Sequence, residues 1–212
     1  MSAIQMIEYS TSEFPKDKIS RREILRYMGC KESSPETELL IDKGISECLD
    51  KLSYKVVYSE YQIKTDGEIL DLGFAQTKSK NARKALENCN SIILFAATIG
   101  LEIDRQIMKY GRFSPSLALC IQAIGAERIE ALCDRFCLDM KEKFASEGKA
   151  LRPRFSAGYG DLPLEFQRDI FSALACEKNI GLTLNDSFLM SPTKSVTAVM
   201  GIQNPYITKE KQ

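Results

Sequence analysis

The segment Arg154-Phe-Ser-Ala-Gly-Tyr-Gly-Asp-Leu-Pro-Leu164 combines a fixed cation, two glycines and an aromatic side chain among turn-forming residues. Arg154 presents a rigid guanidinium fork that suits a carboxylate or a phosphate. Gly158 and Gly160 permit positive φ angles and a close approach of the backbone to a ligand. Tyr159 adds a flat face and a hydroxyl group. The segment is a candidate loop for binding a small charged ligand, and it is equally typical of a surface turn that leads into a helix.

A second motif, Leu184-Asn-Asp-Ser-Phe-Leu-Met-Ser-Pro-Thr-Lys-Ser-Val-Thr197, follows after one expected helix. Together the two segments resemble the activation domain of cobalamin-dependent methionine synthase. That family has an Arg-x-x-x-Gly-Tyr loop, a helix, an acid-Ser segment, a Met, a Pro and a Ser-Val-Ser strand. The matching residues here are Arg154, Gly158, Tyr159, Asp186, Ser187, Met190, Pro192, Ser195 and Val196. The resemblance is strongest over residues 152–201, which we expect to hold the ligand-binding motifs.

The resemblance implies a site for S-adenosylmethionine. Arg154 would pair with the carboxylate of the ligand, and the backbone around Ala157 and Gly158 would form hydrogen bonds with it. Tyr159 lies where the binding loop of the family faces the corrin ring, and it could stack on the ligand or meet the sulfonium through its π face. Tyr159 is therefore the expected catalytic residue.

Three departures from the family pattern affect the expected site. Met200 and Gly201 complete the expected cofactor-binding set, but they stand where the family has an aromatic pair beside the ligand. The segment Gly160-Asp-Leu-Pro163 also differs, and the aromatic Asp-Trp segment that the family has near its N-terminus is missing. That segment supplies an acidic contact to the ligand, for which Asp161 or Asp186 could substitute here.

The function implied by the resemblance is that of a stand-alone activation subunit within a methyltransferase complex. Cob(II)alamin on a partner chain is reduced by one electron and then methylated by S-adenosylmethionine. Since cobalt(I) is the nucleophile and no proton is removed, a chain without histidine is compatible with this reaction. The implied partners are a cobalamin-binding methionine synthase core chain and, as electron donor, a flavodoxin or a ferredoxin.

Other functions fit part of the same pattern. The chain could reactivate another corrinoid methyltransferase, or it could be a non-enzymatic interaction module whose loop is only structural. A Rossmann-type methyltransferase is disfavoured, because no strand is followed by a Gly-x-Gly-rich turn and an acidic residue at the end of the next strand.

Composition excludes further classes of protein. The 212 residues include 29 basic and 29 acidic side chains, so no overall field favours nucleic acid or an anionic membrane. The absence of histidine removes the usual general base and the commonest metal ligand. No signal peptide is recognisable, and the longest apolar run, residues 92–97, is too short to span a bilayer.

The cysteines indicate a reducing compartment. There are seven, an odd number without a Cys-x-x-Cys pair, which favours free thiols and a cytoplasmic location. Cys133 and Cys137 lie one helical turn apart, but two thiolates make an incomplete zinc or iron site. We therefore expect no metal site, and buried cysteine side chains instead.

Hydrophobic periodicity predicts the elements that position these motifs. Residues 1–30 form an expected docking segment, whose helix presents Ile24, Leu25 and Met28 and ends at Gly29. A second helix is expected to start at Ser34-Pro35. Further helices are expected within residues 78–88, 101–110, 117–144 and 164–177. Strands are expected at 54–63 and 68–72, paired as a hairpin, and at 91–97 and 196–200, followed by a polar tail at 202–212.

The expected fold class is α+β, a single domain of residues 1–212 with helices packed on a mixed or antiparallel sheet. The helix at 117–144 should be the central packing helix. Its charged residues are expected to form a solvated face of intrahelical pairs; they are Glu127, Arg128, Glu130, Asp134 and Arg135. In the resembled domain, carboxylates of the corresponding helix approach the cofactor, so Glu130 or Asp134 could have that role.

Overall fold

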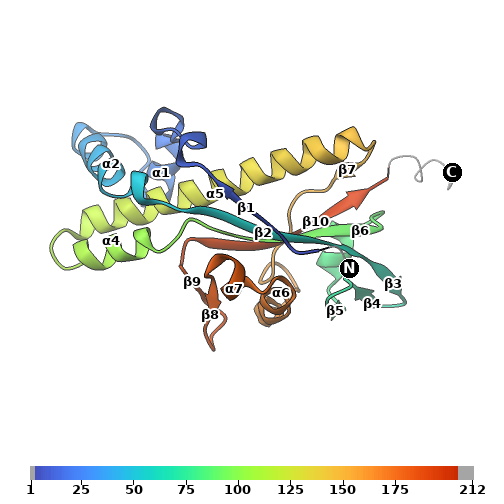
Figure 1. Ribbon diagram of the computed structural model, residues 1–212. Helices are drawn as coiled ribbons and strands as arrows, with labels where there is room; N and C mark the ends of the chain where they lie inside the picture. Colours follow the sequence, from blue (N-terminus) through green and yellow to red (C-terminus); the bar gives the residue numbers. More distant parts are fainter. Residues whose placement is uncertain (1–2, 205–212) are drawn as a thin grey trace.

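The computed structural model describes residues 3–204 and contains a five-stranded antiparallel sheet with helices on both faces (Figure 1). In spatial order the strands are β1 (Gln5–Tyr9), β2 (Tyr54–Gln62), β6 (Ser91–Thr98), β10 (Ser195–Gln203) and β7 (Ala150–Leu151). Two small sheets consist of β3 (Lys64–Asp66), β4 (Ile69–Asp71) and β5 (Gln76–Thr77), and of β8 (Thr183–Leu184) and β9 (Met190–Ser191). The predicted α+β class, one domain with helices on an antiparallel sheet, is confirmed.

The helices divide between the two faces of the sheet (Figure 1). One face carries α1 (Arg21–Met28), α2 (Pro35–Cys48), α4 (Glu102–Tyr110) and the long α5 (Pro115–Ser146). The other face carries α3 (Lys80–Ala85), α6 (Gln167–Leu174) and α7 (Cys176–Ile180). Short 3-10 turns lie at Thr11–Glu13, Lys16–Lys18, Leu49–Lys51 and Leu164–Phe166. Within residues 3–204, no helix combines the length and the apolar character needed to cross a membrane.

The central position of β6 in the sheet explains why its sequence is apolar at nearly every position. Ile93 and Phe95 belong to the hydrophobic cluster that includes α5. Ile92 and Leu94 belong to the cluster on the opposite face, with α6 and α7. Because side chains alternate along a strand and both faces are covered by helices, the positions of β6 between Ser91 and Thr98 all need apolar residues.

Local signals for helix ends are confirmed. The Ser34 side chain accepts a hydrogen bond from Thr37 N at the start of α2, and Pro35 occupies the first turn. Gly29 ends α1 with a φ of 76°, a left-handed conformation that glycine adopts without strain. These caps set where α1 ends and where α2 begins.

Three expected elements differ from the structure. The hairpin of 54–63 with 68–72 is wrong, because β2 pairs with β1 and β6, and only Lys64–Asp66 pairs with β4. The expected helix at 164–177 is interrupted at Ala175, where φ is 46°. The last strand continues to Gln203, so Ile202 is a core residue and not the start of a polar tail. The rest of the expected tail, residues 205–212, lies outside the described residues.

The expectation of a fully solvated charged face on α5 is also wrong. Arg128 is only 2% exposed and Glu127 only 6%. The Arg128 Nε donates to Glu127 Oε2 over 2.5 Å, and Glu127 Oε1 accepts a hydrogen bond from Ser20 N over 3.1 Å. Since Ser20 caps α1, this buried ion pair fixes the start of α1 against α5.

Glu127→Gln should strongly destabilise the protein, because it leaves the Arg128 guanidinium buried without a counter-ion. We expect a loss of about 3 to 5 kcal/mol in the free energy of unfolding, measured by urea denaturation. The matched control Glu130→Gln changes a partly exposed carboxylate on the same helix and should cost about 0 to 1 kcal/mol. Equal losses in the two variants would contradict a special role for the buried pair.

Candidate functional site

The segment after β7 runs along β10 and brings the two sequence motifs side by side. Arg152 N donates to Gly201 O over 2.8 Å. Further along, Phe155 and Val199 exchange two hydrogen bonds of 2.9 Å each. The candidate binding loop therefore starts from the edge of the main sheet, next to Met200 and Gly201.

Side chains of the same segment form hydrogen bonds with both ends of α3. At the C-terminal end, the Arg152 guanidinium donates to Ala85 O over 3.1 Å and to Lys84 O over 3.3 Å. At the N-terminal end, the Asp161 carboxylate accepts hydrogen bonds from Lys80 N at 2.7 Å and Asn81 N at 3.1 Å, and from the Ser79 hydroxyl. A cation at the carbonyl end and an anion at the amide end both suit the helix dipole. We call residues 152–161 with α3 the clamp.

The clamp explains why the two glycines stand in the loop. Gly158 and Gly160 have φ angles of +81° and +62°, and Gly158 N donates to Leu162 O over 2.9 Å. The resulting turn leads into the Leu164–Phe166 turn and α6. This agrees with the alternative that the motif is a surface turn leading into a helix. Tyr159 projects from it with 70% of its surface exposed, its ring edge-on to Phe155 at 5.8 Å.

Arg154 extends from the loop toward α5. Its Nη2 donates to Glu130 Oε2 over 2.5 Å and to Asp134 Oδ1 over 3.3 Å. Its neighbour Phe155 packs with the cluster on the other face of the sheet, so the two side chains leave the segment in opposite directions. Within residues 3–204, the hydrogen bonds of the Arg154 side chain use Nη2, which leaves its Nε and Nη1 donors for a ligand.

The carboxylates paired with Arg154 line a cleft between α1 and α5. This cavity of about 290 Å³ is lined by Ser20, Glu23, Arg26, Tyr27, Glu127, Glu130, Ala131 and Asp134. Glu23 pairs with Arg26, and Glu127 pairs with Arg128. The two remaining carboxylates, Glu130 and Asp134, share the single cation Arg154. The cleft thus carries one negative charge more than its cations neutralise, which favours a cationic ligand.

The other expected site residues have different surroundings. Ala157 is half-buried in the turn. Met200 is 1% exposed and packs in the cluster with α5, whereas Gly201 faces Cys89 and Leu86. The position of Gly201 requires glycine, since an added Cβ would overlap the Cys89 sulfur.

The two alternative acids differ in what they contact. Asp161 is already used at the N-terminus of α3, where the hydrogen bond from Ser79 is the main cause of its lowered pKa. Asp186 is exposed in a turn held by Asn185, whose side chain accepts hydrogen bonds from Ser187 N and Leu189 N. Of the carboxylates considered from the sequence, Glu130 and Asp134 are those in contact with Arg154.

The cysteines show no arrangement suited to chemistry. All seven are free thiols, and burial raises the pKa of the Cys133 thiol to about 12. In the part of the chain that the structure describes, no three potential metal-ligating side chains gather into one group.

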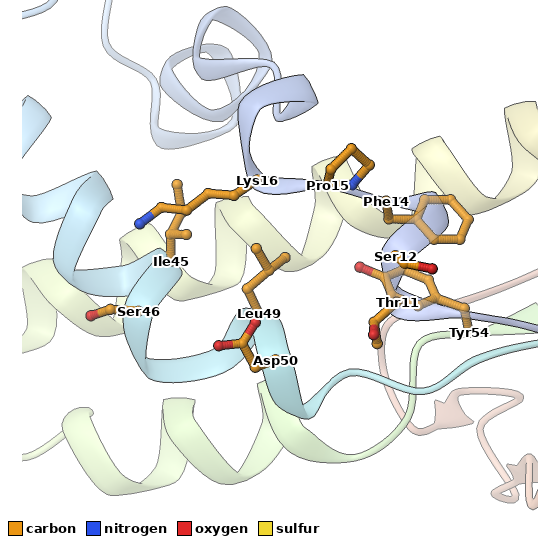
Figure 2. Close-up of a pocket in the computed structure, with 10 residues that line it drawn as sticks. All are labelled: Thr11, Ser12, Phe14, Pro15, Lys16, Ile45, Ser46, Leu49, Asp50 and Tyr54. Atoms are coloured by element: carbon orange, nitrogen blue, oxygen red, sulfur yellow. The ribbon is translucent and has the colours of Figure 1, made fainter.

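A separate cavity of about 370 Å³ lies between the N-terminal segment and α2 (Figure 2). Phe14, stacked on Tyr54 at 4.1 Å, and Leu49 form its apolar part, and Lys16 extends across it toward Ile45 (Figure 2). None of its lining residues belongs to either sequence motif. We therefore place the candidate site at Arg154 and the α1–α5 cleft.

Comparison with solved structures supports the architecture inferred from the motifs. The fold is similar to that of a crystal structure of the MetH reactivation domain bound to AdoHcy, with a TM-score of 0.71 and 17% sequence identity. The match covers 96% of this chain and 79% of that one. No protein-family model and no curated protein sequence matches this chain. At this identity the likeness confirms the resemblance to an activation domain at the level of the fold.

Gly160→Ala should release the loop from α3, because an added Cβ would lie 2.8 Å from Asn81 Cγ at a φ of +62°. We expect faster hydrogen exchange at the amides of Lys80 and Asn81, measured by mass spectrometry. The matched control is Gly67→Ala, where φ is also positive, at +54°, but no atom lies within 4 Å. Unchanged exchange in the Gly160 variant would show that the loop does not hold α3.

Asp161→Asn should remove a stabilisation that depends on pH. The folded-state pKa of Asp161 is lowered, mainly by the Ser79 hydroxyl, so the carboxylate stabilises the fold above its ordinary pKa of about 4. This contribution is lost as pH falls through the lower folded-state value. The wild type should therefore melt at a higher temperature than the variant at pH 7, and the difference should shrink toward pH 3. A difference independent of pH would contradict the clamp.

Proposed function

We propose that this chain, which has the fold of a MetH reactivation domain, is an activation subunit of a cobalamin-dependent methionine synthase. It would bind S-adenosylmethionine for the reductive methylation of cob(II)alamin carried by a partner chain. The observation that carries the proposal is Arg154, which keeps unused donors beside a cleft with one uncompensated negative charge. The AdoHcy in the similar crystal structure supports the ligand class.

The charges of S-adenosylmethionine are complementary to those of the site. Arg154 binds the α-carboxylate as a charge-assisted pair through Nη1, a donor that Glu130 and Asp134 leave free. Glu130 and Asp134 then face the ammonium and the sulfonium. The ligand has one net positive charge and the cleft one net negative charge, so binding leaves the site neutral.

The turn at Ala157–Tyr159 would contact the part of the ligand that extends from Arg154 past the edge of the sheet. Gly158 N is already bonded to Leu162 O, so the ligand is met by the backbone of Ala157 and by the Gly158 carbonyl. Tyr159, 70% exposed, offers its π face to the sulfonium and its outer side to the partner. Met200 and Gly201 support this arrangement from the sheet, where Gly201 O accepts the hydrogen bond from Arg152 N.

The contribution of this chain to the reaction is alignment. When bound, the sulfonium would supply a methyl group to the reduced cobalt of a cobalamin on the partner, and the ligand would leave as AdoHcy. Arg154 and the two α5 carboxylates fix the orientation of the methyl donor. No residue of this chain has to remove a proton, because the cobalt is the nucleophile. The electron comes from a flavodoxin or a ferredoxin.

Arg154→Ala should weaken binding of S-adenosylmethionine by about 10- to 100-fold, the value of a charge-assisted hydrogen-bonded pair. Asp134→Asn should weaken the binding of S-adenosylmethionine more than the binding of AdoHcy, because AdoHcy lacks the sulfonium charge. Calorimetric titration of both ligands into the wild type and the variants measures these effects. Arg135→Ala is the matched control, since Arg135 is on the same helix but pairs with Glu13 and Asp139.

The same titration separates the rival functions. No saturable binding to the wild type, alone or with a cobalamin-loaded partner, would favour a non-enzymatic interaction module. If binding is found, the absorbance change on methylcobalamin formation with candidate partner chains distinguishes methionine synthase from another corrinoid methyltransferase.

A further inference from the structure

We propose that the outer face of α3 forms a second ligand site, which binds an organic phosphate. Lys80, Arg83 and Lys84 follow the i, i+3, i+4 spacing that places side chains on one face of a helix, and Glu87 lies in the turn just after α3. This face lines a cavity of about 390 Å³, together with residues of the β2–β3 connection and the small β3–β4–β5 sheet. None of these four side chains belongs to the S-adenosylmethionine site proposed above.

The cations of this cavity have no anionic partners. Among the described residues, 3–204, no ion pair includes Lys80, Arg83 or Lys84. Three cations and the carboxylate of Glu87 give the lining a net charge of two positive units. A phosphate monoester dianion matches this charge, whereas a single carboxylate leaves half of it uncompensated.

Arg83 provides an independent observation that favours an anion. Its Nε is shielded from solvent and has no acceptor among the described residues. A buried donor without a partner is destabilising, and such groups are uncommon in folded proteins unless a ligand or water supplies the acceptor. In the proposed complex the Arg83 side chain rotates so that this Nε opens to the cavity and donates to a phosphate oxygen, while Lys80 and Lys84 neutralise the remaining charge.

The apolar part of the lining indicates that the phosphate carries an apolar body. Ile63, Leu70 and Leu86 line the cavity beside the cations. Thr65 and Asn88 add a hydroxyl and an amide at its edge. Inorganic phosphate would leave the apolar wall uncovered, whereas an aromatic or aliphatic phosphate ester uses both parts of the cavity.

The probe is 1-naphthyl phosphate, titrated into the full chain and followed by its fluorescence, with 1-naphthol and inorganic phosphate in parallel. We expect saturable binding of 1-naphthyl phosphate and at least tenfold weaker binding of each of the other two. Arg83→Gln should weaken the binding of 1-naphthyl phosphate at least tenfold, and Lys84→Gln should weaken it at least threefold. The control Lys141→Gln makes the same change at an exposed lysine of α5 and should have no effect.

Equal affinity in the Arg83 and Lys141 variants, or no saturable binding to the wild type, would overturn the proposal. Inorganic phosphate that binds as tightly as the ester would overturn the apolar part of it. Circular dichroism checks the folding of each variant, and Lys80→Gln/Lys84→Gln replaces Arg83→Gln if that chain does not fold. Arg154→Ala should leave the naphthyl phosphate affinity unchanged, so failure of this site and failure of the proposed function are distinguishable.

Discussion

The position of the candidate ligand loop depends on two charges of opposite sign at the ends of a six-residue helix. Arg152 satisfies carbonyl groups at the C-terminus of α3, and Asp161 satisfies amide groups at its N-terminus. A helix this short is not stable in isolation, because most of its backbone groups lack intrahelical partners. The loop and α3 therefore stabilise each other. These contacts also fix the positions of Arg154 and Tyr159, which lie between Arg152 and Asp161 in the loop.

A short stretch of α5 has two separate tasks. Glu127 and Arg128 point inward and join α1 to the core through Ser20. One turn later, Glu130 and Asp134 point outward and meet Arg154. The inward pair is structural because it is desolvated, whereas the outward carboxylates stay accessible and can exchange partners with a ligand. The difference arises from helical phase, not from residue type.

The features that sequence predicted well are those with local causes. The cap at Ser34-Pro35 and the doubly covered strand at residues 91–97 depend on neighbours in the sequence or on strand alternation. The turn after Arg154 was predicted from Gly158 and Gly160, which have positive φ angles, and the binding role of Arg154 stays a prediction. The tasks of Glu127 and Asp161 were not predictable, because their partners lie 107 and 80 to 82 residues away. Strand β1 was missed because its burial pattern lacks regular alternation.

The attachment of the N-terminal segment to α5 has a consequence for the order of events during synthesis. Tyr9 donates a hydrogen bond to Asp139, and Ser20 to Glu127, across separations of 130 and 107 residues. Residues 3–30 are translated before α5 but cannot complete their packing until α5 has emerged. This segment therefore packs late although it is made before α5, and the apolar groups that it later covers stay exposed in the meantime.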